Sequence, residues 1–138
     1  MNVGKITFDA TTLKTMALFE QVTGARLKDF VPSELIFIIE AGDMGKAIGK
    51  NASNVKRVEQ LLKKNVQLVE FSDDLSVFIK NLVVPAEVLT VENHEGVVTI
   101  RSRDPRSKGM IFGRERSRLS LMKDIVKRHF PVTDIKVV

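Results

Sequence analysis

The stretch that decides the fold is residues 43–56, which read DMGKAIGKNASNVK. Its pattern predicts a short helix, a tight turn that opens at Gly49, and a second helix. Gly49 allows the backbone to turn sharply and lets another backbone approach closely. The N–H groups that open the second helix carry partial positive charge, so this turn suits an anion such as a phosphate.

The same pattern recurs 64 residues later, where residues 108–119 read KGMIFGRERSRL. At this offset Gly49 matches Gly113, and Lys50 matches Arg114. The apolar positions of the following helix also match, so that Val55, Val58, Leu61 and Leu62 correspond to Leu119, Met122, Ile125 and Val126. Two such loops, each followed by the same apolar helix, indicate an internal repeat.

The length of 138 residues fits one ordinary domain or two small ones. The offset of the repeat is close to half the chain, which favours two domains. We therefore predict a first domain over residues 1–72 and a second over residues 73–138.

Composition excludes several classes of protein. The chain has no cysteine, so disulfides and thiolate metal sites are excluded and a cytoplasmic location is expected. Its longest apolar run, Leu35–Ile39, is too short to span a bilayer, and the N-terminal residues lack the pattern of a signal peptide. We expect no membrane association.

Basic residues gather around the second glycine loop. The net charge is +5, and the segment from Arg101 to Arg118 holds two acidic residues among its cations. These cations are Arg101, Arg103, Arg106, Lys108, Arg114, Arg116 and Arg118. Such a cluster is typical of a surface that binds a polyanion, although a thermostable protein can also carry many solvated cations. Its position around a repeated glycine loop favours the polyanion.

Hydrophobic periodicity predicts the same element order in each half: helix, strand, strand, short helix, loop, helix and strand. In the first half we expect a helix from Asp9 to about Thr23 with Leu13, Met16, Ala17 and Phe19 on its apolar side, strands at 25–31, 34–40 and 66–71, and a loop helix that Asn65 ends. In the second half we expect a helix after Asp73 and Asp74 that ends before Pro85, a hairpin of 87–92 and 97–102, a basic loop at 103–107, a helix at 117–129 and a strand at 134–138. Residues 1–8 are open between an edge strand and loose chain.

This order resembles the prokaryotic (type II) KH domain, in which two strands precede the glycine loop. Two such units in direct tandem resemble the KH pair of the NusA transcription factors, and the lack of further domains resembles the short archaeal NusA-like proteins. The resemblance covers residues 9–138 and rests most on residues 43–55 and 103–119. It implies an α+β fold of two tandem type II KH domains, each with a three-stranded sheet and helices packed on one face.

KH domains recognise RNA by clamping about four nucleotides of backbone against a Gly-x-x-Gly loop. The resemblance therefore implies a monomeric, non-enzymatic transcription termination or antitermination factor that binds single-stranded RNA, needs no cofactor or metal, and has RNA polymerase as a further partner. Ala52 and Arg116 stand where the second glycine of each loop is expected, and Glu115 adds a negative charge. The RNA-binding residues that the resemblance implies are Lys46, Gly49, Lys50, Asn51, Ala52 and Lys56 in the first half, and Lys108, Gly113, Arg114, Glu115, Arg116 and Arg118 in the second.

The enzymatic interpretations of the sequence have weaker support. Residues 45–51 faintly resemble a nucleotide-binding P-loop, but one residue is missing between the glycines and Asn51 replaces the hydroxyl residue that magnesium needs. His94 is expected in a hairpin turn and His129 near a helix C-terminus, with no partner that suggests catalysis or a metal site. Ser53 and Ser117 are expected to cap helices rather than to act as nucleophiles.

A second functional class stays open. KH loops that lack a glycine could belong to an interaction module that contacts protein, such as RNA polymerase or ribosomal components. A basic groove past Gly49 and Gly113 would favour RNA, and an acid-lined one would favour protein. The chain has no Trp or Tyr and its eight Phe residues fall mostly at core-like positions, which disfavours an aromatic platform for base stacking.

Overall fold

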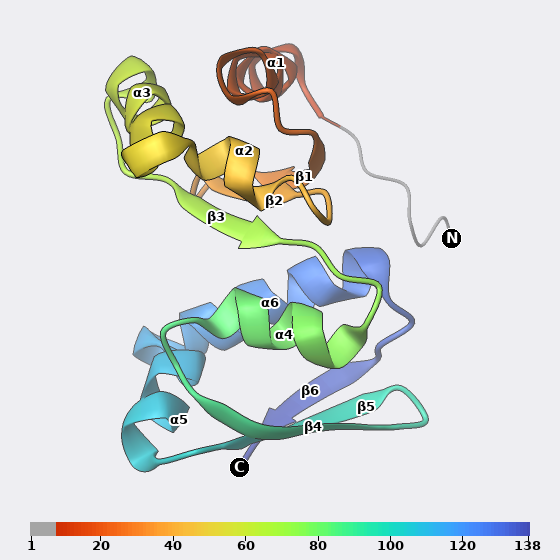
Figure 1. Ribbon diagram of the computed structural model, residues 1–138. Coiled ribbons are helices and arrows are strands. Elements are labelled where there is room, and N and C mark those ends of the chain that lie inside the picture. The colour runs from red at the N-terminus through yellow and green to blue at the C-terminus, as the bar shows by residue number, and fades with distance from the viewer. Residues whose placement is uncertain (1–7) are drawn as a thin grey trace. The chain divides into compact units, whose positions relative to one another are not determined.

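The computed structural model describes residues 8–138, which form two compact units, residues 8–72 and 73–138 (Figure 1). Both units combine helices with a three-stranded sheet, so the predicted α+β class is confirmed. The alternatives for residues 1–8 concern a segment that lies, except for Phe8, outside the described residues.

The first unit follows the predicted element order. Its elements are α1 (Ala10–Thr23), β1 (Leu27–Val31), β2 (Ile36–Ile39), α2 (Met44–Ile48), a 3-10 turn η1 (Lys50–Ala52), α3 (Ser53–Leu62) and β3 (Gln67–Glu70). The sheet order is β1-β2-β3, with β1 antiparallel and β3 parallel to β2. Figure 1 shows the three helices on one side of this sheet.

The core of the first unit is built on stacked phenylalanines. The Phe37 ring lies 4.2 Å from that of Phe19 on α1 and 4.4 Å from that of Phe30 on β1, measured between centroids. Ala47 of α2 and Val58 of α3 complete the cluster and are fully buried. Because β2 is the central strand and all four of its residues are buried, its unbroken apolar run was a reliable signal.

The apolar side predicted for α1 is wrong in part. Leu13 is 53% exposed and Ala17 is also exposed, whereas Phe19 is buried as expected. The buried stripe instead includes Thr12 and Thr23, which share one helical face with Phe19. Thr23 satisfies its hydroxyl by donating to the carbonyl of Phe19 at 2.8 Å, so a polar residue can occupy this buried site.

The helix after the first loop also differs from the prediction. Val58 is buried and Leu62 is half-buried, but Leu61 is 49% exposed because it is turned about 100° away from Leu62 around the helix axis. The helix ends at Leu62 rather than near Asn65. Lys63 adopts a left-handed conformation with φ 58° and donates its N–H to the Glu59 carbonyl, which closes the C-terminus.

The second unit has the same order. Its elements are α4 (Leu75–Val83), β4 (Val88–His94), β5 (Val97–Ser102), α5 (Pro105–Phe112), a 3-10 turn η2 (Arg114–Arg116), α6 (Ser117–His129) and β6 (Asp134–Val137). The sheet order is β4-β5-β6, again antiparallel and then parallel, with its helices on one side (Figure 1). The four predicted core positions of α6, Leu119, Met122, Ile125 and Val126, are all buried.

The segment predicted as a basic loop at 103–107 is mostly helical. Asp104 caps α5 by accepting a hydrogen bond from the Ser107 N–H at 2.7 Å, and Pro105 is the first helical residue. Proline suits this position because its missing N–H would have no partner within the helix. The helix before the second loop therefore has eight residues, against five in α2.

Candidate nucleic-acid interface

The first glycine loop joins α2 to α3 through a backbone that only glycine adopts easily. Gly49 has φ 76° and ψ 172°, a region that residues with a side chain rarely enter. Its N–H donates to the Gly45 carbonyl at 2.9 Å, and its carbonyl accepts from the Ala52 N–H at 3.2 Å. Asn51 and Ala52 then have left-handed φ angles of 55° and 60° before α3 begins.

Close packing against Asn54 also favours glycine at position 49. A Cβ at this position would lie 2.9 Å from the backbone nitrogen of Asn54, a distance that such atoms essentially never show. The Asn54 side chain donates to the Lys46 carbonyl at 2.7 Å and so ties α3 back to α2 across the loop. Sequence reasoning did not identify Asn54, whose only signal was its place five residues after the glycine.

The second loop repeats this backbone within a few degrees. Gly113 has φ 69° and ψ 178°, and Glu115 and Arg116 have left-handed φ angles of 56° and 63°. The Gly113 N–H donates to Gly109 at 2.9 Å and the Arg116 N–H donates to Gly113 at 3.3 Å. A Cβ on Gly113 would lie 2.9 Å from the backbone nitrogen of Arg118. The two loops therefore follow the same course, although Ala52 and Arg116 differ greatly in size.

Neither helix after a loop has a side-chain cap. Ser53 and Ser117 were predicted as caps, but each is the first helical residue, and the cap positions fall on Ala52 and Arg116 without a side-chain hydrogen bond. The prediction failed because the left-handed residues before each serine extend the loop by one position. The opening N–H groups of α3 and α6 are consequently left without a side-chain acceptor, as an anion site requires.

Lysines border the first loop on both sides. Lys46 lies on α2, Lys50 at the turn and Lys56 on α3, and all three are exposed. Asn51 is exposed at the tip and Ala52 is half-buried. None of the three lysines forms an ion pair with a residue of the described range 8–138. Their charges are free to meet an external anion.

Arginines border the second loop. Arg114, Arg116 and Arg118 are exposed, as are Lys108 on α5 and Glu115 at the tip. The guanidinium carbon of Arg116 lies 5.5 Å from the centroid of the Phe112 ring. Sequence reasoning did not single out Phe112, although it directly precedes the loop glycine.

Comparison with known proteins now identifies the family. The model of the KH domain family matches residues 14–136. A protein of Halococcus morrhuae named "Probable transcription termination protein NusA" is 31% identical over 96% of this chain and 99% of the relative. One of Methanococcus vannielii with the same name is 34% identical over 97% of this chain and 80% of the relative. The chain belongs to the archaeal NusA-like family of KH-domain proteins.

A solved structure agrees with the fold. The crystal structure of APE1850 matches 91% of this chain and 96% of its own with a TM-score of 0.70 at 24% identity. The likeness supports the fold and extends over both units of this NusA-like chain.

The predicted cluster of cations is divided by the sheet. Val98 and Ile100 of β5 face the helices and are buried, so Arg101 points to the opposite face of the strand. Arg103 forms an ion pair with Glu87, its Nε lying 3.3 Å from the carboxylate. The cations that remain near the loop of this NusA-like chain come from α5, η2 and α6.

Acidic side chains hold each loop helix in place. The carboxylate of Asp43 accepts from the Arg26 N–H at 2.9 Å and from its Nε at 3.3 Å, rather than capping α2. The hydrogen bond from the Arg26 backbone is the largest cause that lowers the pKa of Asp43. In the second unit the Ser107 backbone N–H likewise lowers the pKa of Asp104.

The geometry gives the enzymatic interpretations no support. Helix α2 stands between β2 and the first loop, whereas a P-loop follows its strand directly. His94 is the last residue of β4 rather than part of the turn, and His129 ends α6 with its ring edge-on to Phe78. Within residues 8–138 no three acidic or histidine side chains gather as metal ligands, and no helix is both long and apolar enough to cross a membrane.

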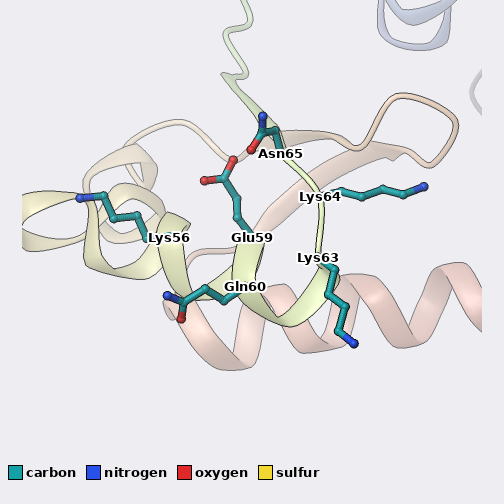
Figure 2. Close-up of a pocket in the computed structure, with 6 residues that line it drawn as sticks. All are labelled: Lys56, Glu59, Gln60, Lys63, Lys64 and Asn65. Carbon is teal, nitrogen blue, oxygen red and sulfur yellow. The ribbon is translucent and has the colours of Figure 1, made fainter.

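A shallow depression on α3 is lined by further lysines, but they do not converge. Figure 2 shows Lys56, in the first half of α3, and Lys63 and Lys64, just after its last residue, pointing in different directions. Glu59, which also lines the depression, accepts a hydrogen bond from the Val66 N–H at 3.0 Å. This depression is the C-terminal turn of α3 rather than a second anion site.

Proposed function

We propose that this chain is a tandem of type II KH domains, residues 1–72 and 73–138, that binds single-stranded RNA through its two glycine loops. The observation that carries the proposal is the backbone that the two loops share, each followed by a helix without a side-chain cap. Exposed cations beside each loop add the charge that a phosphate chain needs. The NusA names of the relatives support a role in transcription termination or antitermination.

Phosphates would be held by the opening N–H groups of α3 and α6 together with the nearby cations. Single strands should bind better than duplexes, because the clamp needs an accessible backbone and bases that are splayed from one another. We also propose that the protein is a monomer and that RNA polymerase is a further partner. The partner is suggested by the transcription-termination names of the relatives.

We propose that the two loops divide the work. The first presents Lys50, Asn51 and Ala52, which leave room for a sugar-phosphate chain to approach closely. The second presents Arg114 and Arg116, whose bulk limits close approach but whose guanidinium groups can reach phosphates. The first loop then acts mainly as a clamp and the second mainly as a source of charge.

The test is a titration of labelled single-stranded and duplex RNA at several salt concentrations. Lys50→Ala with Lys56→Ala and Arg114→Ala with Arg118→Ala should each weaken binding and flatten its salt dependence. The logarithmic slope should fall by about 0.7 for each phosphate that the variant no longer neutralises. Lys14→Ala with Lys80→Ala removes the same charge from exposed sites on α1 and α4 and should leave the slope unchanged.

Three outcomes would contradict the proposal. Equal affinity for duplex and single strand would exclude the clamp mechanism. Loop variants that fold and bind like the wild type would place the RNA site elsewhere. If the protein binds no RNA in vitro and crosslinks to none in cells, the alternative of a module that contacts protein is favoured.

A further inference from the structure

The Arg116 side chain is the one loop cation with an aromatic neighbour in the described residues. Its guanidinium carbon lies 5.5 Å from the centre of the half-buried Phe112 ring, within the range of a cation–π contact. The two residues flank Gly113 and its turn, with Phe112 ending α5 and Arg116 ending η2. The turn that the glycine makes brings these two side chains together.

The first loop lacks this pair although its backbone is the same. The residues at the corresponding positions are Ile48, which is 40% exposed, and Ala52. The aromatic ring therefore occurs in the loop that carries arginine at the missing-glycine position, and an aliphatic side chain occurs in the other. The ring and the arginine occur together in one loop and are both absent from the other. This indicates that Phe112 interacts with Arg116 rather than shaping the loop backbone that both units share.

We propose that Phe112 is a positioning residue that holds the Arg116 guanidinium over its ring, ready to bind a phosphate of single-stranded RNA. The inference rests on the proposed RNA-binding function and names the phosphate contact of the second loop. A free arginine loses side-chain entropy when it binds, whereas a stacked one has already given up part of that entropy. Stacking on an aromatic face leaves the N–H edge of the guanidinium available for phosphate oxygens.

A double-mutant cycle in RNA affinity tests this role. Phe112→Leu should weaken binding roughly two- to fivefold, because Arg116 must then lose on binding the side-chain entropy that the stacked arrangement has already removed. Arg116→Ala should lower the salt slope by about 0.7. Adding Phe112→Leu to Arg116→Ala should cause no further loss of affinity, because no guanidinium is left to position. Phe112→Tyr keeps an aromatic face and should bind like the wild type.

A second measurement needs no RNA. In the nuclear magnetic resonance spectrum of the free protein, the ring current of Phe112 should shift the Arg116 Nε–H resonance. Phe112→Leu should move this resonance toward the position of an unstacked arginine, and Phe112→Tyr should preserve it. An Arg116 resonance that Phe112→Leu leaves unmoved would overturn the inference at the level of the contact itself.

The outcomes separate this inference from the proposed function. If the wild type binds RNA and Phe112→Leu binds equally well, or weakens binding as much in Arg116→Ala as in the wild type, the positioning role is wrong and the RNA function stands. If the resonance shifts as expected but the wild type binds no RNA, the contact is real and both functional proposals fail. Ile48→Phe with Ala52→Arg transplants the pair into the first loop and should steepen the salt slope by about 0.7.

Discussion

The two glycine loops share one backbone and differ in almost every side chain that faces solvent. Gly49 and Gly113 have nearly the same dihedral angles, as do the two residues that precede each following helix. After the glycine, the first loop has lysine, asparagine and alanine, and the second has arginine, glutamate and arginine. The same backbone path therefore accommodates exposed side chains that differ in charge and size.

The supports of the loops differ as well. In the first unit Asp43 bonds Arg26, which is distant in sequence, and α2 is short. In the second unit Asp104 caps the longer α5 locally through Ser107. The same loop can thus be held either by a long-range contact or by a local cap.

The largest effect is expected from the loop glycines. Gly49→Ala and Gly113→Ala should each lower the free energy of unfolding by about 2–3 kcal/mol, since each adds a strained φ and a clash with a backbone nitrogen. Gly45→Ala and Gly109→Ala are matched controls, because both lie in helices with open space around a Cβ. Denaturant titration should show a gain of about 0.5–1 kcal/mol for these controls.

The same measurement sets a limit on RNA studies. An acidic residue at Gly49 would confound a binding assay, because the positive φ and the lack of room for a Cβ at Gly49 destabilise the fold while the added charge repels phosphate. Stability equal to the wild type in Gly49→Ala but not in Gly113→Ala would show that the two loops are less alike than their backbones indicate.

A smaller effect is expected at the missing second glycines. Ala52→Gly should raise the free energy of unfolding by about 1 kcal/mol, because φ 60° disfavours a residue with a side chain. Arg116→Gly should give a smaller gain, since it also removes the interaction with Phe112. Ala47→Gly, at a buried helical position, should instead destabilise. A larger gain from Arg116→Gly than from Ala52→Gly would argue against that interaction.

The smallest effect concerns acid stability. The pKa values of Asp43 and Asp104 lie below the ordinary value of 3.8 in the folded chain. Their contribution to stability is therefore present above about pH 3.8 and is lost as pH falls through the folded pKa. Melting temperatures between pH 6 and 2.5 should fall at the acid end, and less so in Asp43→Asn and Asp104→Asn.

At neutral pH these two variants should differ from each other. Asparagine caps helices about as well as aspartate, so Asp104→Asn should melt close to the wild type. Asp43→Asn should melt lower, because an amide cannot form the charged pair with the Arg26 side chain. Equal melting temperatures for the two variants at pH 7 would show that the long-range contact adds nothing beyond a local cap.

Much of this fold could be predicted from sequence because its signals are local. The helix that starts after Asp9 and stops at Gly24 follows capping rules, and α6 spans the predicted residues 117–129. The buried run of β2 and the repeated loop glycines are likewise visible in the chain itself. Motifs of this kind were sufficient to indicate the family.

Other features depend on how elements pack, and only the tertiary structure decided them. Periodicity offered both Leu61 and Leu62 as core residues, but the rotation of α3 against the sheet exposes the first and half-buries the second. The contact of Asp43 with Arg26 joins residues 17 positions apart, and no local rule predicts it. Ala52 and Arg116 adopt left-handed conformations that residues with a side chain disfavour. Local propensity could not predict them, because the closure of each loop determines these conformations. Sequence by itself determined the elements, the repeat and the loop glycines; packing decided which faces are buried and which side chains meet at the loops.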